Sequence, residues 1–205
     1  MPARPAPLPE ATLAAAVDYA RDRLRLELDS RLAYHDFAHT ADNVVPAVAR
    51  LAAGEGITGR DAQRLIVAAW FHDIGYLVRY ERNESDAVAL AAEVLPGLGL
   101  SVDDVAEVAR SILATEVPQR PTSLAGQVLA DADLFVLGTN RFASQHRALQ
   151  QELAAFGRVY SDDDWVRAQI RFLTEHRYFT GTARRLNEHG KAANLAHLRS
   201  QLGEG

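Results

Sequence analysis

The sequence contains no cysteine, and that absence removes several kinds of chemistry at once. Disulfide bonds, zinc sites built from thiolates and a cysteine nucleophile are all excluded. There is also no run of about 18 apolar residues, the length that a membrane-spanning helix needs. With 22 basic and 27 acidic residues, and a formal net charge of -5, the chain lacks the basic face of a general nucleic-acid binder. Any metal ion must therefore be held by histidine and carboxylate side chains.

Two further absences concern location and phosphate binding. The Pro-rich start, residues 1–9, has no apolar core of the kind found in secretory signal peptides, so we expect a flexible arm and a cytoplasmic protein. No Gly-rich phosphate-binding loop appears in the chain. The remaining stretch, residues 10–205, has the length of one domain and can bury a substantial core.

Apolar residues recur at three- to four-residue steps through most of the chain, and the alternation typical of strands is nowhere sustained. Residues 10–29 are typical, with Leu13, Val17, Ala20 and Leu24 on one helix face. We therefore predict an all-α fold of about nine helices. Three segments resemble helix N-terminal capping boxes: residues 58–61, 101–104 and 161–164.

Three residues should bend a helix or mark one of its ends. Pro46 lies inside the second helical pattern and should bend that helix, because proline removes one backbone hydrogen bond. Gly75 is expected to cap the helix that runs from Leu65 to Phe71 at its C-terminal end, and Asn83 to cap the start of the next.

The most informative stretch is residues 68–76, Ala-Ala-Trp-Phe-His-Asp-Ile-Gly-Tyr. Its apolar helical run brings His72 and Asp73, side by side, to the edge of a core. A carboxylate in such a place is costly unless something neutralises its charge, and a divalent metal ion would do so. The alternative is that His72 and Asp73 form a buried hydrogen bond that only stabilises the fold, in a helical protein with a structural role.

Two other places offer groups of the same kind. His35 and His39 are four residues apart and share a face if both are helical. Asp131 and Asp133 lie in an otherwise apolar helix and need partners, because buried acids seldom stand alone. Together with residues 72–73 they supply a mixed nitrogen and oxygen set. That set suits one divalent ion such as Mn²⁺, Fe²⁺, Co²⁺, Ni²⁺ or Zn²⁺ better than Mg²⁺.

Each of these residues also has an ordinary structural explanation. His35 could be exposed near a helix start, and His39 could be a surface or hydrogen-bonded core histidine. Asp131 could be solvated on the outer helix face, and Asp133 could pair with Arg141. The remaining histidines lie in polar surroundings, and we expect them on the surface: His146, His176, His189 and His197.

The order of these motifs resembles the HD superfamily of metal-dependent phosphohydrolases, in particular a bacterial branch of predicted HD phosphohydrolases. The first motif also resembles that of the cyclic nucleotide phosphodiesterases. The resemblance covers roughly residues 30 to 198 and is specific only when the motifs are taken together. It is carried by Tyr34-His35-x-x-x-His39, Phe71-His72-Asp73-Ile74-x-Tyr76, Asn83-Glu84-Ser85, Ile112-Leu113-Ala114-Thr115, Asp131-Ala132-Asp133-Leu134 with Leu137-Gly138, and Ala192-x-Asn194-Leu195.

This resemblance implies an HD-domain-like multi-helix bundle, with residues 10–205 as one HD-type helical domain that has a C-terminal helical extension. It also implies a function and a role for each residue. His39, His72, Asp73 and one aspartate of the 131/133 pair would bind the metal ion, and the Ala-Asp-Leu context favours Asp133. By its likeness to the phosphodiesterases, His35 would be the general acid that protonates the leaving oxygen. Asp73 or Asp133 could orient the attacking water. The expected activity is hydrolysis of a small phosphoester, with a nucleotide as the expected substrate and neither a nucleic-acid polymer nor a membrane as partner.

One departure from the family pattern affects both the metal count and the activity. Many relatives carry a further histidine shortly after the segment that ends at Thr115, where this chain has Glu116 and no histidine. We therefore expect one metal ion. The departure also keeps open an alternative, a regulatory HD module that binds metal or nucleotide with little turnover. For the phosphate, the candidates by position are Arg79, Arg82 and Arg141, and no heptad seam indicates an oligomeric state.

Overall fold

The computed structural model describes residues 5–203, and within them nine α-helices and no strand. The expected all-α class is confirmed. No helix in this range combines the length and the apolar character needed to cross a bilayer. The helices are α1 (Glu10–Glu27), α2 (Val45–Gly54), α3 (Gly59–Phe71), α4 (Asn83–Val94), α5 (Val102–Leu113), α6 (Leu124–Asp133), α7 (Phe142–Ala155), α8 (Asp162–Glu175) and α9 (Gly181–Gln201).

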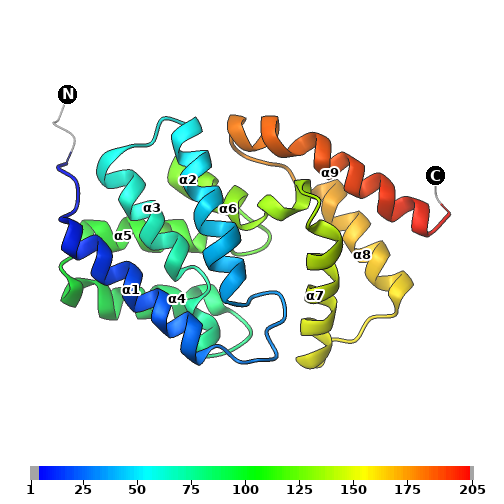
Figure 1. Cartoon of the computed structure of the whole chain (residues 1–205), viewed down its shortest axis with the longest axis horizontal. Helices are drawn as coiled ribbons and strands as arrows, with labels where there is room; N and C mark the ends of the chain where they lie inside the picture. Colours follow the sequence, from blue (N-terminus) through cyan, green and yellow to red (C-terminus); the bar gives the residue numbers. More distant parts are fainter. Residues whose placement is uncertain (1–4, 204–205) are drawn as a thin grey trace.

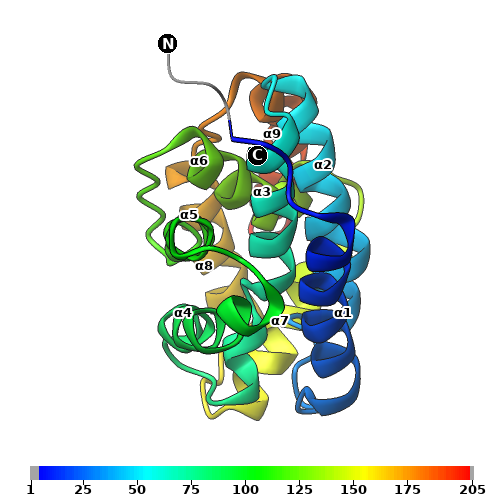
Figure 2. The same cartoon turned by 90° about the vertical axis from the view of Figure 1, so that its left-hand side faces the viewer.

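The helices surround two hydrophobic cores of unequal size. Helices α1 to α6 pack on the larger core, and α7, α8 and α9 lie together beside them (Figure 1). Figure 2 shows α4 and α5 end-on, one above the other, next to α3. The smaller core lies among α7, α8 and α9 and is formed by Leu137, Phe142, Val166, Leu173 and Leu198.

Two of the three expected capping signals begin helices by the expected bond. The Ser101 Oγ accepts a hydrogen bond from the Asp104 N–H at 3.3 Å, and the Asp104 carboxylate accepts one from the Ser101 N–H at 2.9 Å. Ser161 caps α8 through its hydroxyl. Thr58 is the N-cap residue of α3 but its side chain makes no capping hydrogen bond, and Asp61 pairs with Arg64.

The predictions for Gly75 and Asn83 were wrong in their detail. Helix α3 ends at Phe71, and Gly75 lies in a following 3₁₀ turn, Ile74–Leu77. A Cβ at Gly75 would lie only 1.8 Å from the Asn83 carbonyl oxygen, so this glycine is needed for the close approach of α4. Asn83 is the first residue of α4 and not its cap, since Arg82 precedes it with a φ of 61°.

The irregularity expected at Pro46 lies one turn earlier. Residues His39–Val44 form a π-helical segment, in which the Val45 N–H donates to the Thr40 carbonyl oxygen. Pro46 follows in the first turn of α2, a position that tolerates proline. Single π-helical turns inside helices occur frequently at functional sites.

Two residues of the N-terminal arm, Ala6 and Leu8, contact α3 within the range that the structure describes. Leu8 is 4 % exposed, and its N–H donates to the Gln63 side chain at 2.6 Å. Arg60 donates to the Ala6 carbonyl oxygen at 2.8 Å. These contacts hold Ala6 and Leu8 against α3, the flexibility expected for residues 1–9 stays a prediction, and residues 1–4 lie outside the described range.

Candidate functional site

His39 begins the π-helical segment and is buried, with 3 % of its surface exposed. Its backbone N–H donates to the Asp36 carboxylate at 2.8 Å, which holds the start of this segment in place. His35 lies in the bend before the helical turn, so the two histidines do not share one helix. Their rings are nevertheless neighbours, with centroids 5.6 Å apart.

His72 follows the last residue of α3 and is fully enclosed, with 1 % of its surface exposed. The His72 Nδ1–H donates to the Ala69 carbonyl oxygen at 2.7 Å. This bond fixes the ring orientation and leaves the lone pair on Nε2. That buried Nε2 has no hydrogen-bond partner among the described residues. A buried acceptor without a partner is costly, and a metal ion is one group that can use it.

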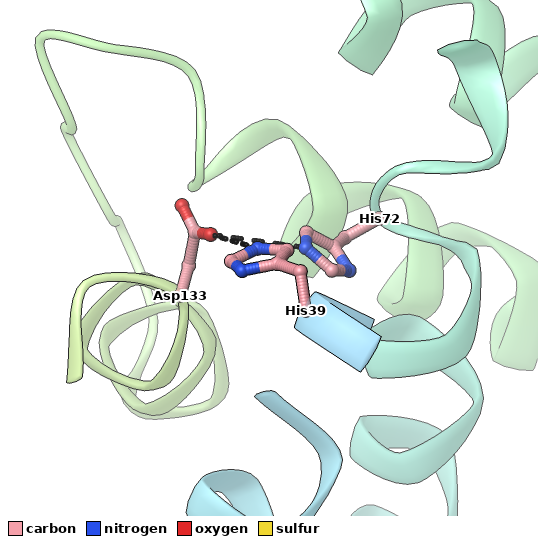
Figure 3. A group of neighbouring side chains, drawn as sticks. All are labelled: His39, His72 and Asp133. Carbon is pink, nitrogen blue, oxygen red and sulfur yellow. Dashed lines mark hydrogen bonds and ion pairs between the residues drawn. The ribbon is translucent and has the colours of Figure 1, made fainter. Parts of the chain in front are cut away.

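Asp133, the last residue of α6, points at both histidines (Figure 3). One of its carboxylate oxygens lies 3.2 Å from the His39 Nε2 and 3.7 Å from the His72 Nε2. One ligand atom from each of the three residues lies within 4.8 Å of the others. Three segments far apart in the sequence thus bring two imidazoles and a carboxylate together at one point.

Asp73 extends this cluster. Its Oδ2 lies 3.1 Å from the His72 Nε2 and 3.5 Å from the His39 Nε2, and this oxygen is buried without a hydrogen-bond partner in the described range. Its other oxygen accepts a hydrogen bond from the Asn83 amide at 3.4 Å. All four residues expected to bind a metal ion therefore lie around one point, with unused lone pairs on His72 and Asp73.

Asp131, the alternative to Asp133, is used elsewhere. It is fully buried, so it is not a solvated residue of the outer helix face. Its carboxylate accepts hydrogen bonds from the N–H groups of Phe179 and Thr180, each at 2.8 Å, and from the Thr180 hydroxyl at 2.7 Å. Thr180 is the N-cap of α9, so Asp131 holds the start of that helix in place.

His35 is held by a glutamate that sequence reasoning missed. The His35 Nδ1 lies 2.5 Å from an oxygen of Glu152, which is fully buried in α7. The same carboxylate accepts hydrogen bonds from the N–H groups of Tyr34 and His35, at 2.8 and 2.9 Å, and from the Tyr80 hydroxyl at 3.1 Å. A weak signal was available, because Glu152 lies on the same helix face as Leu149 and Phe156.

The buried charges of the site favour ion pairs. Burial opposes a charged His35, but the hydrogen bond with Glu152 outweighs burial and raises the pKa of His35. Burial likewise opposes a charged Glu152, and its hydrogen bond with His35 lowers the pKa of that carboxyl. Both shifts favour an imidazolium paired with a carboxylate. Burial opposes a charged His72, but the adjacent Asp73 carboxylate outweighs burial and raises the pKa of His72 to about 9. A metal ion at the His72 Nε2 would take the place of that proton.

A cavity of about 510 Å³ opens beside these groups. Its wall includes His35, Asp73 and Asp133, and much of the remainder comes from α7 and α8. Glu84 also lies on this wall, and burial raises the pKa of its carboxyl. The volume falls in the usual range for small-molecule sites, about 300–1,000 Å³.

None of the three arginines proposed as phosphate contacts lies on the wall of this cavity. Arg79 and Arg82 lie before α4 and face elsewhere, and Arg141 lines a separate cavity beside α2. The arginine on the wall is Arg158, which donates to Glu81 at 2.6 Å. These three assignments rested on sequence position alone and were wrong.

Two of the four remaining histidines are not surface residues. His176 is only 9 % exposed, and neither of its ring nitrogens has a partner in the described range. His146 is half-buried and accepts a hydrogen bond from the Trp165 indole N–H at 3.0 Å. His189 and His197 are exposed, as expected.

Comparison with solved structures finds two proteins with this fold. One is a predicted HD superfamily hydrolase from an uncultured Thermotogales bacterium, with a TM-score of 0.61 and 23 % identity over 94 % of this chain and 92 % of that one. The other is Bacillus subtilis YpgQ in complex with ADP, with a TM-score of 0.65 and 22 % identity over 95 % and 97 % of the two chains. No family model and no curated protein matches the sequence. The chain thus has the fold of a protein named as an HD superfamily hydrolase, as its motifs predicted.

Proposed function

We propose that this chain is a metal-dependent phosphohydrolase of the HD superfamily that acts on a small phosphoester. The observation that carries the proposal is the buried, unpartnered Nε2 of His72, which lies among His39, Asp73 and Asp133 on the edge of a cavity. Such a group of unused acceptors is costly in a core unless a cation completes it.

The donor set fits one divalent metal ion. His39 and His72 offer imidazole nitrogens and Asp73 and Asp133 offer carboxylate oxygens, a mixture that suits Mn²⁺, Fe²⁺, Co²⁺, Ni²⁺ or Zn²⁺ better than Mg²⁺. The Nδ1–H bond of His72 to the Ala69 carbonyl oxygen is the kind of outer contact that orients a metal-binding histidine. When bound, such an ion supplies Lewis acidity, which polarises a phosphoryl oxygen and makes water acidic enough to attack near neutral pH.

The chain itself supplies a general acid and a carboxylate that can orient the attacking water. His35 lies on the cavity wall, and its pairing with Glu152 keeps a proton on the ring, so it can protonate the leaving oxygen. Asp73 or Asp133, which both lie on the cavity wall, can orient the attacking water. Glu152 touches neither reacting atom in this scheme and positions His35.

A nucleotide is the proposed substrate. YpgQ, which shares the fold, was solved in complex with ADP, and the volume of the cavity suits a ligand of that size. We propose the cytoplasm as the compartment. The phosphatase and phosphodiesterase alternatives differ in whether the scissile phosphorus carries one ester bond or two.

A second candidate function is a regulatory module that binds a metal ion or a nucleotide without appreciable turnover. The residues after Thr115 favour it, since no histidine follows there to complete a second metal site. The single arginine on the cavity wall, Arg158, already pairs with Glu81.

The proposal is tested by turnover in the presence of each candidate metal ion. The panel contains nucleoside mono- and diphosphates, p-nitrophenyl phosphate and bis(p-nitrophenyl) phosphate, the last two separating phosphatase from phosphodiesterase activity. We expect metal-dependent hydrolysis that the His72→Ala variant loses and the exposed Glu93→Gln variant keeps. Thermal stabilisation by a nucleotide without turnover would support the regulatory module instead.

A further inference from the structure

A second cavity lies outside the site described above, between the loop that follows α5 and the connection from α8 to α9. Its volume is about 320 Å³. Neither His35 nor any of the four residues proposed to bind the metal ion lies on its wall. Val117, Leu134 and Phe172 lie on the walls of both cavities, so the two cavities are neighbours. What the second cavity can bind therefore depends on residues other than the proposed catalytic set.

The His176 imidazole is a buried polar group on this wall, and neither of its nitrogens makes a hydrogen bond among residues 5–203. The residue is 9 % exposed, and its ring packs at 85° against the Tyr178 ring, with centroids 4.6 Å apart. The neighbouring amine of Lys191 does not serve the ring, because it donates to the His176 carbonyl oxygen at 2.9 Å. Such a buried group is costly without a partner. The χ2 torsion of histidine is broad, so a turn of the ring can present a nitrogen to a ligand in the cavity.

The charges around His176 favour an anion as that ligand. Burial, and after it the Lys191 charge, lower the pKa of His176 to about 4, so the ring is neutral near pH 7. A neutral imidazole offers one N–H donor. Lys191 and Glu188 face it from α9 as an ion pair at 2.9 Å, and Arg177 adds a second positive charge. The two positive groups and the one negative group that act on the ring leave a net positive charge beside it.

Arg177 is a cation on the same wall, and not all of its donors are used. Its Nη1 donates to the carbonyl oxygens of Thr174 and His176, at 2.5 and 2.8 Å. Its Nε and Nη2 make no hydrogen bond or ion pair in the described range. These two nitrogens carry the parallel N–H groups that pair with both oxygens of a carboxylate. Arg177 and His176 together therefore fit a carboxylate group.

The remainder of the wall limits the rest of the ligand. Much of it is apolar, and it includes Val117, Leu134, Phe172 and Phe179. An apolar cavity of about 150 Å³ holds one benzene molecule. A cavity of about 320 Å³ therefore admits one ring or a short chain together with its carboxylate. Glu175, which is exposed on the same wall, disfavours a ligand with several negative charges.

We propose that the second cavity binds a small monocarboxylate with an aromatic or short aliphatic body, and that its carboxylate pairs with Arg177 and His176. Both contacts are charge-assisted hydrogen bonds, because the carboxylate accepts from the guanidinium and from the N–H of the neutral ring. The apolar body lies against Leu134, Phe172 and Phe179. This inference does not depend on the proposed function, since neither the metal site nor His35 takes part in it.

The test is a calorimetric titration of the purified protein with benzoate and with hexanoate near pH 7. Benzamide and hexanamide serve as uncharged ligands of nearly the same shape. We expect each carboxylate to bind at least about tenfold more tightly than its amide, because the amide cannot form the charge-assisted pair. Equal affinity for an amide and its carboxylate, or no binding of either carboxylate, would overturn the inference.

Four variants locate the bound carboxylate, and urea unfolding checks that each of them is folded. Arg177→Gln and His176→Phe should each weaken benzoate binding about tenfold or more, the second because phenylalanine keeps a planar ring and lacks both nitrogens. Arg171→Gln, at an exposed position of α8, should bind benzoate as the parent does. His72→Ala should do the same, whereas a carboxylate held at a metal ion would be lost there. Parental affinity in Arg177→Gln or His176→Phe, or loss of binding in either of the other two variants, would overturn the inference.

Discussion

The Glu152→Gln variant should lose most of the activity while it keeps the metal ion. Glutamine retains the volume and one oxygen, which can still accept from the N–H groups of Tyr34 and His35. Its NH₂ group then faces the His35 Nδ1 and the Tyr80 hydroxyl, where the parent has a carboxylate oxygen. The charge-assisted hydrogen bond lost at His35 contributes about 1.5–3 kcal/mol. At about 1.4 kcal/mol for each factor of ten, kcat/KM should fall roughly 10- to 150-fold.

The pH profile identifies the cause of that loss. Glu152 raises the pKa of His35, so the parent keeps its acid form to higher pH. In Glu152→Gln the pKa of His35 falls, and the alkaline limb of the kcat/KM profile should move to lower pH. Metal content should equal that of the parent, and the exposed Glu93→Gln variant should behave as the parent in both assays. Parental activity in Glu152→Gln, or loss of the metal ion with the activity, would refute the positioning role of Glu152.

Three further predictions concern the acid, the packing of the site and a buried histidine. His35→Ala should lower kcat by about 10²- to 10⁴-fold with unchanged metal content in elemental analysis, and equal loss of metal would contradict its role as the acid. Gly75→Ala should destabilise the protein in urea unfolding by about 1–3 kcal/mol or more, because a Cβ would lie 1.8 Å from the Asn83 carbonyl oxygen. Gly97→Ala has no atom within 4 Å of its Cβ and should be near neutral. His176 is held neutral by burial, which lowers its pKa to about 4. Since unfolded histidine titrates near 6.5, stability should be full above pH 6.5 and fall by up to about 3 kcal/mol toward pH 4. A His176→Leu variant should lose that slope, and a slope that persists would assign it to other groups.

Most of the residues proposed to bind the metal ion could be chosen from the sequence because each stands in a short local motif. His39, His72 and Asp73 have apolar neighbours in the sequence, so a polar side chain there predicts a buried group with a special partner. The choice between Asp131 and Asp133 needed the structure. Two residues on one helix point about 200° apart, and only the fold shows which of them faces the start of α9.

The residues that sequence reasoning missed act through contacts between distant segments. Glu152 follows His35 by 117 residues, and the apolar residues on its helix face give only a weak signal of burial and none of its partner. Gly75 was expected to end a helix, yet its role comes from the approach of another helix. Arg158 lies on the cavity wall, and the arginines chosen by sequence position do not. It lies there because α7 and the loop after it form part of that wall. In all three cases the role of the residue follows from packing between segments that are distant in the sequence.

Elemental analysis of the purified protein tests the central claim most directly. The protein is prepared without chelator or added metal, beside His72→Ala and the exposed Glu93→Gln variant as a matched control. We expect about one equivalent of a transition metal in the parent and in Glu93→Gln, and loss of that metal in His72→Ala. Absence of metal from all three proteins, even after reconstitution with Mn²⁺, Fe²⁺, Co²⁺, Ni²⁺ and Zn²⁺, would contradict the account and leave the His72–Asp73 pair with a structural role only.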